Sequence, residues 1–176
     1  MARLGFYALV CLLCVLPCSA LASPAPDIEV AFSPYGNSLQ LVLFSIDSAQ
    51  KSILVAAYSF TSKPIATALL NAHSRGVDVR VVADKKANSG RYTAVTFLAN
   101  QGVPVRLNDR YAILHDKFMI LDGKHIQTGS FNYTAAAVAK NAENVLVLQD
   151  VSNLVVQYAR EWERLWSEGE DVEKRY

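Results

Sequence analysis

The apolar residues of this chain recur in two patterns, which predict alternating strands and helices in its first half. Short apolar or alternating runs, typical of strands, lie at residues 28–32, 52–60, 77–83 and 103–107. Apolar residues at helical spacing lie at residues 38–49, 62–75 and 91–100. Because helices that alternate with strands act as crossover connections, this half predicts a sheet covered by helices on both faces.

A short internal repeat supports these boundaries. Residues 75–81 read Arg-Gly-Val-Asp-Val-Arg-Val, and residues 101–107 read Gln-Gly-Val-Pro-Val-Arg-Leu. Each copy predicts the end of a helix, a glycine that stops it, and a following strand. The repeat indicates a recurring structural unit and not two catalytic copies.

The second half predicts a hairpin, a further strand and a terminal helix. Residues 111–121 and 124–130 are strand-like, and Asp122-Gly123 between them is a hairpin signal. Another strand is expected at residues 143–148, followed by a helix that Asp150 caps and whose apolar and aromatic stripe belongs to the core. The predicted fold is a single α/β domain with a mixed, mostly parallel β-sheet flanked by helices on both faces.

Residues 1–22 have the pattern of a secretory signal peptide. Arg3 precedes an apolar run at residues 4–16 that is too short to span a membrane, and residues 20–22 form an A-x-A cleavage site. The predicted mature domain is residues 23–176. It contains none of the three cysteines, and we expect it in the bacterial periplasm or outside the cell, without stable membrane insertion.

The most informative motif is H-x-K-x4-D-x6-G-S-x-N, which begins at His115. Its histidine, lysine, serine and asparagine supply an imidazole, an ammonium, a hydroxyl and a carboxamide within eighteen residues. These groups can attack a phosphodiester and stabilise its oxygens as charge shifts. No acidic metal cage accompanies them, so the predicted chemistry uses no metal and no cofactor.

The predicted hairpin explains how these groups could meet. A two-residue loop of Asp122-Gly123 places His115 opposite Ser130, and a loop of Gly123-Lys124 places Lys117 opposite Ser130. In either register the four side chains share one face of the hairpin, whereas a three-residue loop would break this convergence.

The motif resembles the HKD motif of the phospholipase D superfamily, and the short chain with one motif is most similar to its small bacterial nucleases. The resemblance implies that His115 is the nucleophile, and that Lys117, Ser130 and Asn132 bind the substrate's non-bridging oxygens. It also implies that Asp122 and Gly129 are structural and that Glu143 orients the histidine.

Members of this family use a second histidine to protonate the leaving oxygen, and this chain has one motif. In-line displacement places the attacking and leaving groups on opposite sides of the phosphorus, so one imidazole cannot serve both. His73 and His125 are interpreted as structural or exposed. We therefore expect a homodimer that pairs two copies of His115 across a two-fold axis.

The preferred function is an endonuclease with little sequence preference, acting on DNA and also on RNA. The alternatives are a phospholipase D-type lipid phosphodiesterase and an inactive polyanion-binding module. The formal net charge of +1 does not itself predict nucleic-acid binding. Five basic residues could track a phosphate backbone or could be ordinary solvated side chains: Lys85, Lys86, Arg91, Arg106 and Arg110.

Overall fold

The computed structural model describes residue 1 and residues 27–90 and 93–174. The body of the predicted signal peptide, with its three cysteines, and Arg91 lie outside the described residues. Within the described part of the chain, no helix has the length and apolarity needed to cross a membrane.

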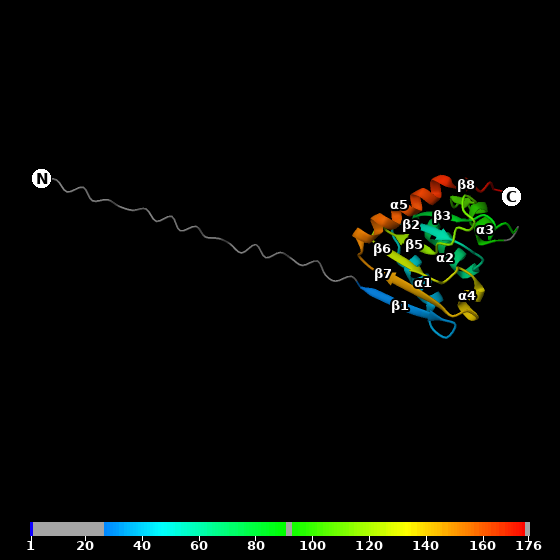
Figure 1. Cartoon of the computed structure of the whole chain (residues 1–176), viewed down its shortest axis with the longest axis horizontal. Helices are drawn as coiled ribbons and strands as arrows, with labels where there is room; N and C mark the ends of the chain where they lie inside the picture. Colours follow the sequence, from blue (N-terminus) through cyan, green and yellow to red (C-terminus); the bar gives the residue numbers. More distant parts are fainter. Residues whose placement is uncertain (2–26, 91–92, 175–176) are drawn as a thin grey trace.

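Eight strands form one sheet in the described residues, in the order β1-β7-β6-β5-β2-β3-β4-β8 (Figure 1). They are β1 (Ile28–Ser33), β2 (Ser52–Ala57), β3 (Asp78–Asp84), β4 (Val105–Asn108), β5 (Phe118–Leu121), β6 (His125–Gly129), β7 (Glu143–Leu148) and β8 (Glu170–Asp171). The strands predicted at 28–32 and 143–148 are confirmed almost to the residue, and those predicted at 52–60, 77–83 and 103–107 are confirmed with shifted ends.

The sheet is mixed, as predicted, but it is not mostly parallel. Only the β2–β3 and β3–β4 pairs are parallel among the seven strand pairs of the described residues. Parallel neighbours need a long crossover, which only the helix-rich first half of the chain provides. The other five pairs of neighbouring strands are antiparallel.

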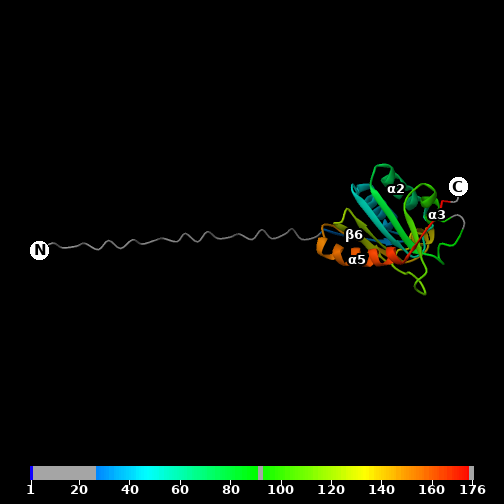
Figure 2. The ribbon, with the colours of Figure 1, turned by 90° about the horizontal axis from the view of Figure 1, so that it is seen from above.

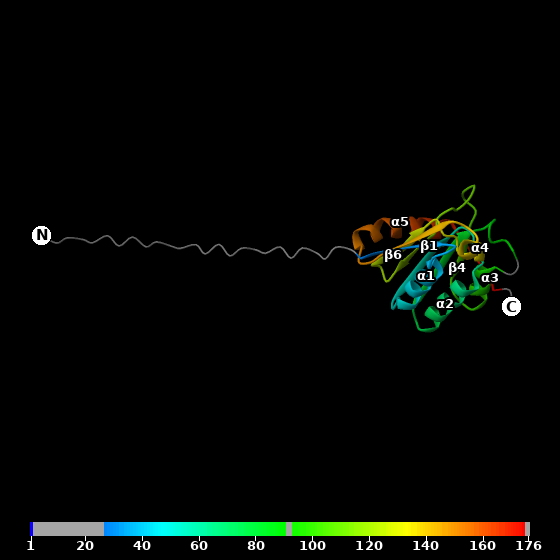
Figure 3. The same cartoon turned by 90° about the horizontal axis from the view of Figure 1, so that it is seen from below.

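Helices cover both faces of the sheet, which confirms the predicted layers. The helices are α1 (Ser38–Ser48), α2 (Lys63–Ser74), α3 (Ala94–Asn100), α4 (Ala135–Ala139) and α5 (Ser152–Glu168). Helices α1 to α4 pack on one face and α5 packs on the other (Figures 2 and 3). Alternate side chains of β2 serve the two layers, since Ile53 and Val55 face α1 and α2 while Ala56 faces α5.

The predicted repeat is confirmed as two copies of one helix ending. Gly76 and Gly102 both have left-handed φ angles, +92° and +90°. Val77 donates its backbone N–H to the Ala72 carbonyl, and Val103 donates in the same way to Leu98. Both are Schellman endings, which orient the chain from a helix into the next parallel strand.

Helix α5 begins differently from the prediction. Asp150 has a φ of +54° and does not cap the helix, whose first residue is Ser152 and whose cap position is held by Val151 without a side-chain bond. Its apolar stripe is core, as predicted. Trp162 is 3% exposed and its indole N–H donates to the Val55 carbonyl at 3.0 Å, which ties the helix to the centre of the sheet.

The turn between β5 and β6 has the predicted residues but a different register. Asp122 and Gly123 both have positive φ, and Lys124 donates its N–H to the Leu121 carbonyl at 3.0 Å. Leu121 nevertheless pairs with His125, so Lys124 is an extra residue and the loop has three residues. Both predicted registers are therefore wrong.

The carboxylate of Asp122 anchors this turn to the start of β2. It accepts backbone N–H groups from Lys51 at 2.7 Å, Gln50 at 3.0 Å and Ser52 at 3.1 Å. Partial burial opposes its ionisation, but these three hydrogen bonds outweigh that effect and lower the pKa of Asp122.

We predict that Asp122→Asn lowers the free energy of unfolding by about 1–2 kcal/mol at pH 7, because charge-assisted hydrogen bonds are lost. The folded-state pKa of Asp122 is lowered, so its stabilisation is complete above its unfolded pKa and is lost as pH falls through the folded pKa. Urea denaturation from pH 7 downward should show the difference between wild type and variant shrinking in acid. An equal difference at all pH values would contradict this origin.

Candidate active site

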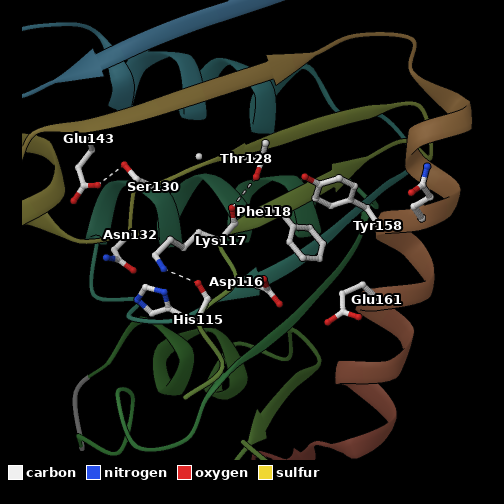
Figure 4. Close-up of a pocket in the computed structure, with 12 residues that line it drawn as sticks. His115, Asp116, Lys117, Phe118, Thr128, Ser130, Asn132, Glu143, Tyr158 and Glu161 are labelled. Carbon is white, nitrogen blue, oxygen red and sulfur yellow. Dashed lines mark hydrogen bonds between the residues drawn. The ribbon is translucent and has the colours of Figure 1, made fainter. Parts of the chain in front are cut away.

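An open pocket of about 760 Å³ lies at the edge of the sheet where the parallel strands β2 and β3 end. His115, Lys117, Ser130, Asn132 and Glu143 line it together (Figure 4). Loops at the carboxyl ends of parallel strands are a common place for binding sites in α/β folds. The predicted convergence of the motif is therefore present in the structure.

The route by which these residues converge differs from the predicted one. The paired part of β5 begins at Phe118, so residues 111–117, predicted as strand, leave the sheet as a loop. With the three-residue turn, strict alternation would place Lys117 on the α1 side of the sheet, opposite to Phe118. Lys117 and Phe118 both line the pocket because the pairing stops between them.

Gly129 ends the other strand of the hairpin. Its φ is +146°, and a Cβ atom on it would lie 2.2 Å from the Asn144 carbonyl oxygen. Only glycine allows this approach. Beyond it, Phe131 and Tyr133 are fully buried on the α1 side, while Ser130 and Asn132 line the pocket, so this loop keeps its alternation.

Lys117 is held inside the site. Its side chain is 8% exposed, its Nζ donates to the His115 carbonyl at 2.6 Å, and the ammonium lies 5.4 Å from the centre of the Tyr58 ring. Burial lowers the pKa of Lys117, although the charges of Asp116 and Glu143 oppose this effect. The imidazole of His115 is exposed to the pocket and also contacts Tyr58, with ring centres 4.8 Å apart.

Ser130 and Glu143 form a hydrogen-bonded pair. The Ser130 hydroxyl donates to a Glu143 oxygen at 2.6 Å and accepts the Asn144 backbone N–H at 3.1 Å. The other Glu143 oxygen accepts from the Asn141 side chain at 2.9 Å. Both Glu143 oxygens are thus engaged by Ser130 and Asn141. This arrangement differs from the expectation that Glu143 orients His115. The predicted donation from Ser130 to substrate requires its hydroxyl to turn away from Glu143.

The Asn132 carboxamide also lines the pocket. Its Oδ1 is buried, and no group in the described part of the chain hydrogen-bonds to it. The neighbouring Tyr133 fixes this loop, because its carbonyl accepts the N–H groups of Thr61 and Ser62 and its hydroxyl donates to Gln127 at 2.8 Å. A polar group is therefore presented to the pocket on a rigid support.

The opposite wall of the pocket comes from α5 and the start of β5 (Figure 4). Tyr158 packs edge-to-face on Phe118 at 4.9 Å, and Glu161 and Asp116 lie beside them. Burial, with the nearby charges of Asp116 and Glu168, raises the pKa of Glu161, which also pairs with Arg164. The pocket thus has one polar side, with Lys117 and Glu143 as its charged residues, and one aromatic, acidic side.

Two of the five basic residues that could track a phosphate backbone serve other purposes. Lys85 pairs with Asp109 at 2.9 Å and Glu170 at 2.8 Å, and these partners raise its pKa. Arg106 pairs with Asp171 at 2.8 Å and lies over the Trp166 ring. Both join β8 to its neighbours and do not line the pocket.

The histidines other than His115 also lie away from this pocket. His73 is in the last turn of α2, and His125 accepts the Asp150 backbone N–H at 3.1 Å. Their interpretation as structural or exposed residues is consistent with these positions.

Sequence reasoning missed Tyr58, Tyr158 and Glu161 as residues of the site. Tyr58 follows a buried strand, and only its position at the carboxyl end of that strand could have indicated a role. Tyr158 and Glu161 belong to a helix whose apolar stripe is mostly core, so no local signal distinguishes them.

A family model described as cardiolipin synthase, phospholipase D-like domain, matches residues 42–166 of this chain. The chain is 35% identical to a Rickettsia conorii protein named phospholipase D, over 77% of this chain and 67% of that one. It is 36% identical to the mitochondrial cardiolipin hydrolase of Xenopus tropicalis, over 86% of this chain and 69% of that one.

Solved structures agree with this assignment. The phospholipase D family member Nuc from Salmonella typhimurium is 42% identical, with a TM-score of 0.82 over 85% of this chain and 99% of Nuc. NucT from Helicobacter pylori shares the fold, with a TM-score of 0.75 at 23% identity over 84% of this chain and 100% of NucT. The sequence, the fold and the clustered motif together show that this chain belongs to the phospholipase D superfamily of phosphodiesterases.

Proposed function

We propose that this chain is an exported, metal-independent endonuclease that cleaves DNA, and also RNA, through a phosphohistidine intermediate at a homodimer interface. The observation that carries this proposal is the meeting of His115, Lys117 and Asn132 in one open pocket. The apolar, A-x-A-terminated pattern of residues 1–22 supports export, with the mature domain at residues 23–176.

In the first step, an imidazole nitrogen of His115 attacks phosphorus and the bond to the leaving ester oxygen breaks. His115 of the partner subunit gives that oxygen a proton. Water then attacks the phosphohistidine, losing a proton to the partner's His115, and a phosphate monoester leaves. Lys117 and Asn132 stabilise the charge on the non-bridging oxygens during both steps, and Ser130 adds a donor once its hydroxyl turns from Glu143.

Similarity to Nuc supports the nucleic-acid substrate, since 42% identity extends over nearly all of that protein. Lys117, Ser130 and Asn132 line the pocket and offer donors for phosphate oxygens, which carry no sequence information, and this favours cleavage without sequence preference.

A lipid phosphodiester is the second candidate. Relatives named phospholipase D and cardiolipin hydrolase favour it. In addition, Ile113 is 48% exposed in the loop two residues before His115, where an apolar chain could rest.

An uncovered apolar surface supports the homodimer. Ile28, Val30 and Phe32 of β1 are 54%, 54% and 60% exposed on the α5 side of the sheet, beyond the strands that α5 covers. Val30 pairs with Leu146, which pairs with Thr128, a residue of the pocket wall. A second copy bound to this surface would lie next to the pocket and could bring its own His115 to the substrate.

We predict that purified mature protein nicks plasmid DNA in excess EDTA, and that His115→Ala abolishes nicking because the nucleophile is lost. His73→Ala, a histidine on α2, should leave the rate unchanged. Phosphatidylcholine and cardiolipin vesicles should be hydrolysed much more slowly than DNA. Loss of nicking in EDTA, or a fully active His115→Ala protein, would refute the proposed function, and rapid lipid hydrolysis without nicking would favour the second candidate.

We further predict that Phe32→Glu yields a monomer with at least tenfold lower activity, because a buried charge disfavours the proposed interface. Phe44→Glu is the matched control, since Phe44 is 63% exposed but lies on α1, on the other side of the sheet. Sedimentation velocity and nicking assays should show a dimeric, active control. A monomeric wild-type protein with full activity would rule out the shared site.

A further inference from the structure

The ring of Tyr58 contacts both the imidazole of His115 and the ammonium of Lys117. Its centre lies 4.8 Å from that of the His115 imidazole, with the planes tilted by 58°, and 5.4 Å from the Lys117 ammonium. We propose that Tyr58 is a positioning residue for phosphodiester cleavage, which holds the His115 imidazole and the Lys117 ammonium in a fixed relative arrangement. The proposal rests on the proposed function and specifies how its site is supported.

The backbone that follows the Tyr58 side chain is fixed by the buried side chain of Asn88. Asn88 is 2% exposed and donates through Nδ2 to the Tyr58 carbonyl at 2.6 Å and to the Asp84 carbonyl at 2.8 Å. Its Oδ1 accepts the Phe60 N–H at 3.0 Å. Tyr58 therefore follows β2 on a short segment with little freedom to move.

The same buried group of residues also fixes the segment that carries His115. Asp84, at the end of β3, is 2% exposed, and its two oxygens accept the Leu114 N–H at 2.8 Å and the Ala87 N–H at 2.7 Å. Leu114 directly precedes His115. The buried pair Asp84 and Asn88 thus links the segment that carries Tyr58 to the segment that carries His115.

The imidazole itself needs a further support, because its side chain is exposed and can rotate about two bonds. An aromatic pair, and a partly desolvated cation over a ring, each stabilise one relative arrangement beyond the effect of burial alone. A misplacement of about 1 Å at a reacting group can cost about 10²-fold in rate. The contacts of the Tyr58 ring are thus strong enough to favour one relative arrangement of the His115 imidazole and the Lys117 ammonium.

Two substitutions separate the ring from the hydroxyl. Tyr58→Phe keeps the ring and should retain kcat within about twofold for bis(p-nitrophenyl) phosphate. Tyr58→Leu removes the ring and should lower kcat by about 10- to 100-fold while KM changes less than threefold, since misplacement affects the reacting groups more than binding. Phe97→Leu, which removes a partly exposed aromatic ring on α3, is the control and should behave as wild type.

A measurement without catalysis tests the contact directly. The sequence contains three histidines, so the imidazole proton signals are few and His115→Asn identifies the relevant one. The ring-current contribution of Tyr58 should persist in Tyr58→Phe and disappear in Tyr58→Leu, with the His73 and His125 signals unchanged. If Tyr58→Leu does not fold, Tyr58→Met, which also lacks a ring, replaces it in both experiments.

The outcomes distinguish this proposal from the function on which it rests. Full kcat in Tyr58→Leu, or a His115 signal that does not respond to loss of the ring, would overturn the positioning role. A loss of kcat equal in Tyr58→Phe and Tyr58→Leu would also overturn it. Absence of phosphodiesterase activity in wild type would instead reject the proposed function, and the imidazole signal would still decide whether the ring contacts His115.

Discussion

Backbone pairing between β5 and β6 stops at the pair of Phe118 and Thr128, and the site depends on where it stops. Continued pairing would direct Lys117 to the opposite side of the sheet from Phe118. The close approach of Gly129 to the Asn144 carbonyl ends β6 at the required place. Two loops, 113–117 and 130–133, then approach each other over the edge of the sheet and carry the motif's polar groups.

The surroundings of the two loops restrict their movement. Asp84 and Asn88 bind backbone groups of three segments, and Tyr133 ties the second loop to the segment after β2. Asp122 is equally important for the fold but lies at the far end of the hairpin, where it binds the start of β2. The motif therefore combines residues that line the pocket with one that stabilises the hairpin supporting it.

Much of this arrangement could be predicted from the sequence, because the signals are local. Helical spacing, the glycines at 76 and 102 and the Asp122-Gly123 turn all specify short-range geometry. The register of the hairpin could not be predicted, since the extra residue Lys124 depends on how β5 and β6 pair with their neighbours. The prediction of a mostly parallel sheet was wrong for a related reason. The order of strands that are distant in the sequence is set by packing and not by local pattern.

The same distinction applies to the site. His115, Lys117 and Asn132 stand out because several unusual residue types occur at fixed spacing. Tyr58 and Glu161 come from distant segments, and only the tertiary fold brings Tyr58 against His115 and Glu161 into the pocket wall. The Ser130–Glu143 bond likewise depends on the pairing of β6 with β7, so the partner of Glu143 could not be read from the motif.

The most direct test of the account is to quench the protein during turnover of a phosphorus-labelled oligonucleotide and locate the label by peptide mass spectrometry. We expect an acid-labile, alkali-stable adduct on the peptide that contains His115, and none in the His115→Ala protein. If the protein turns over substrate but carries no phosphorus label under any quench condition, covalent catalysis through His115 is contradicted.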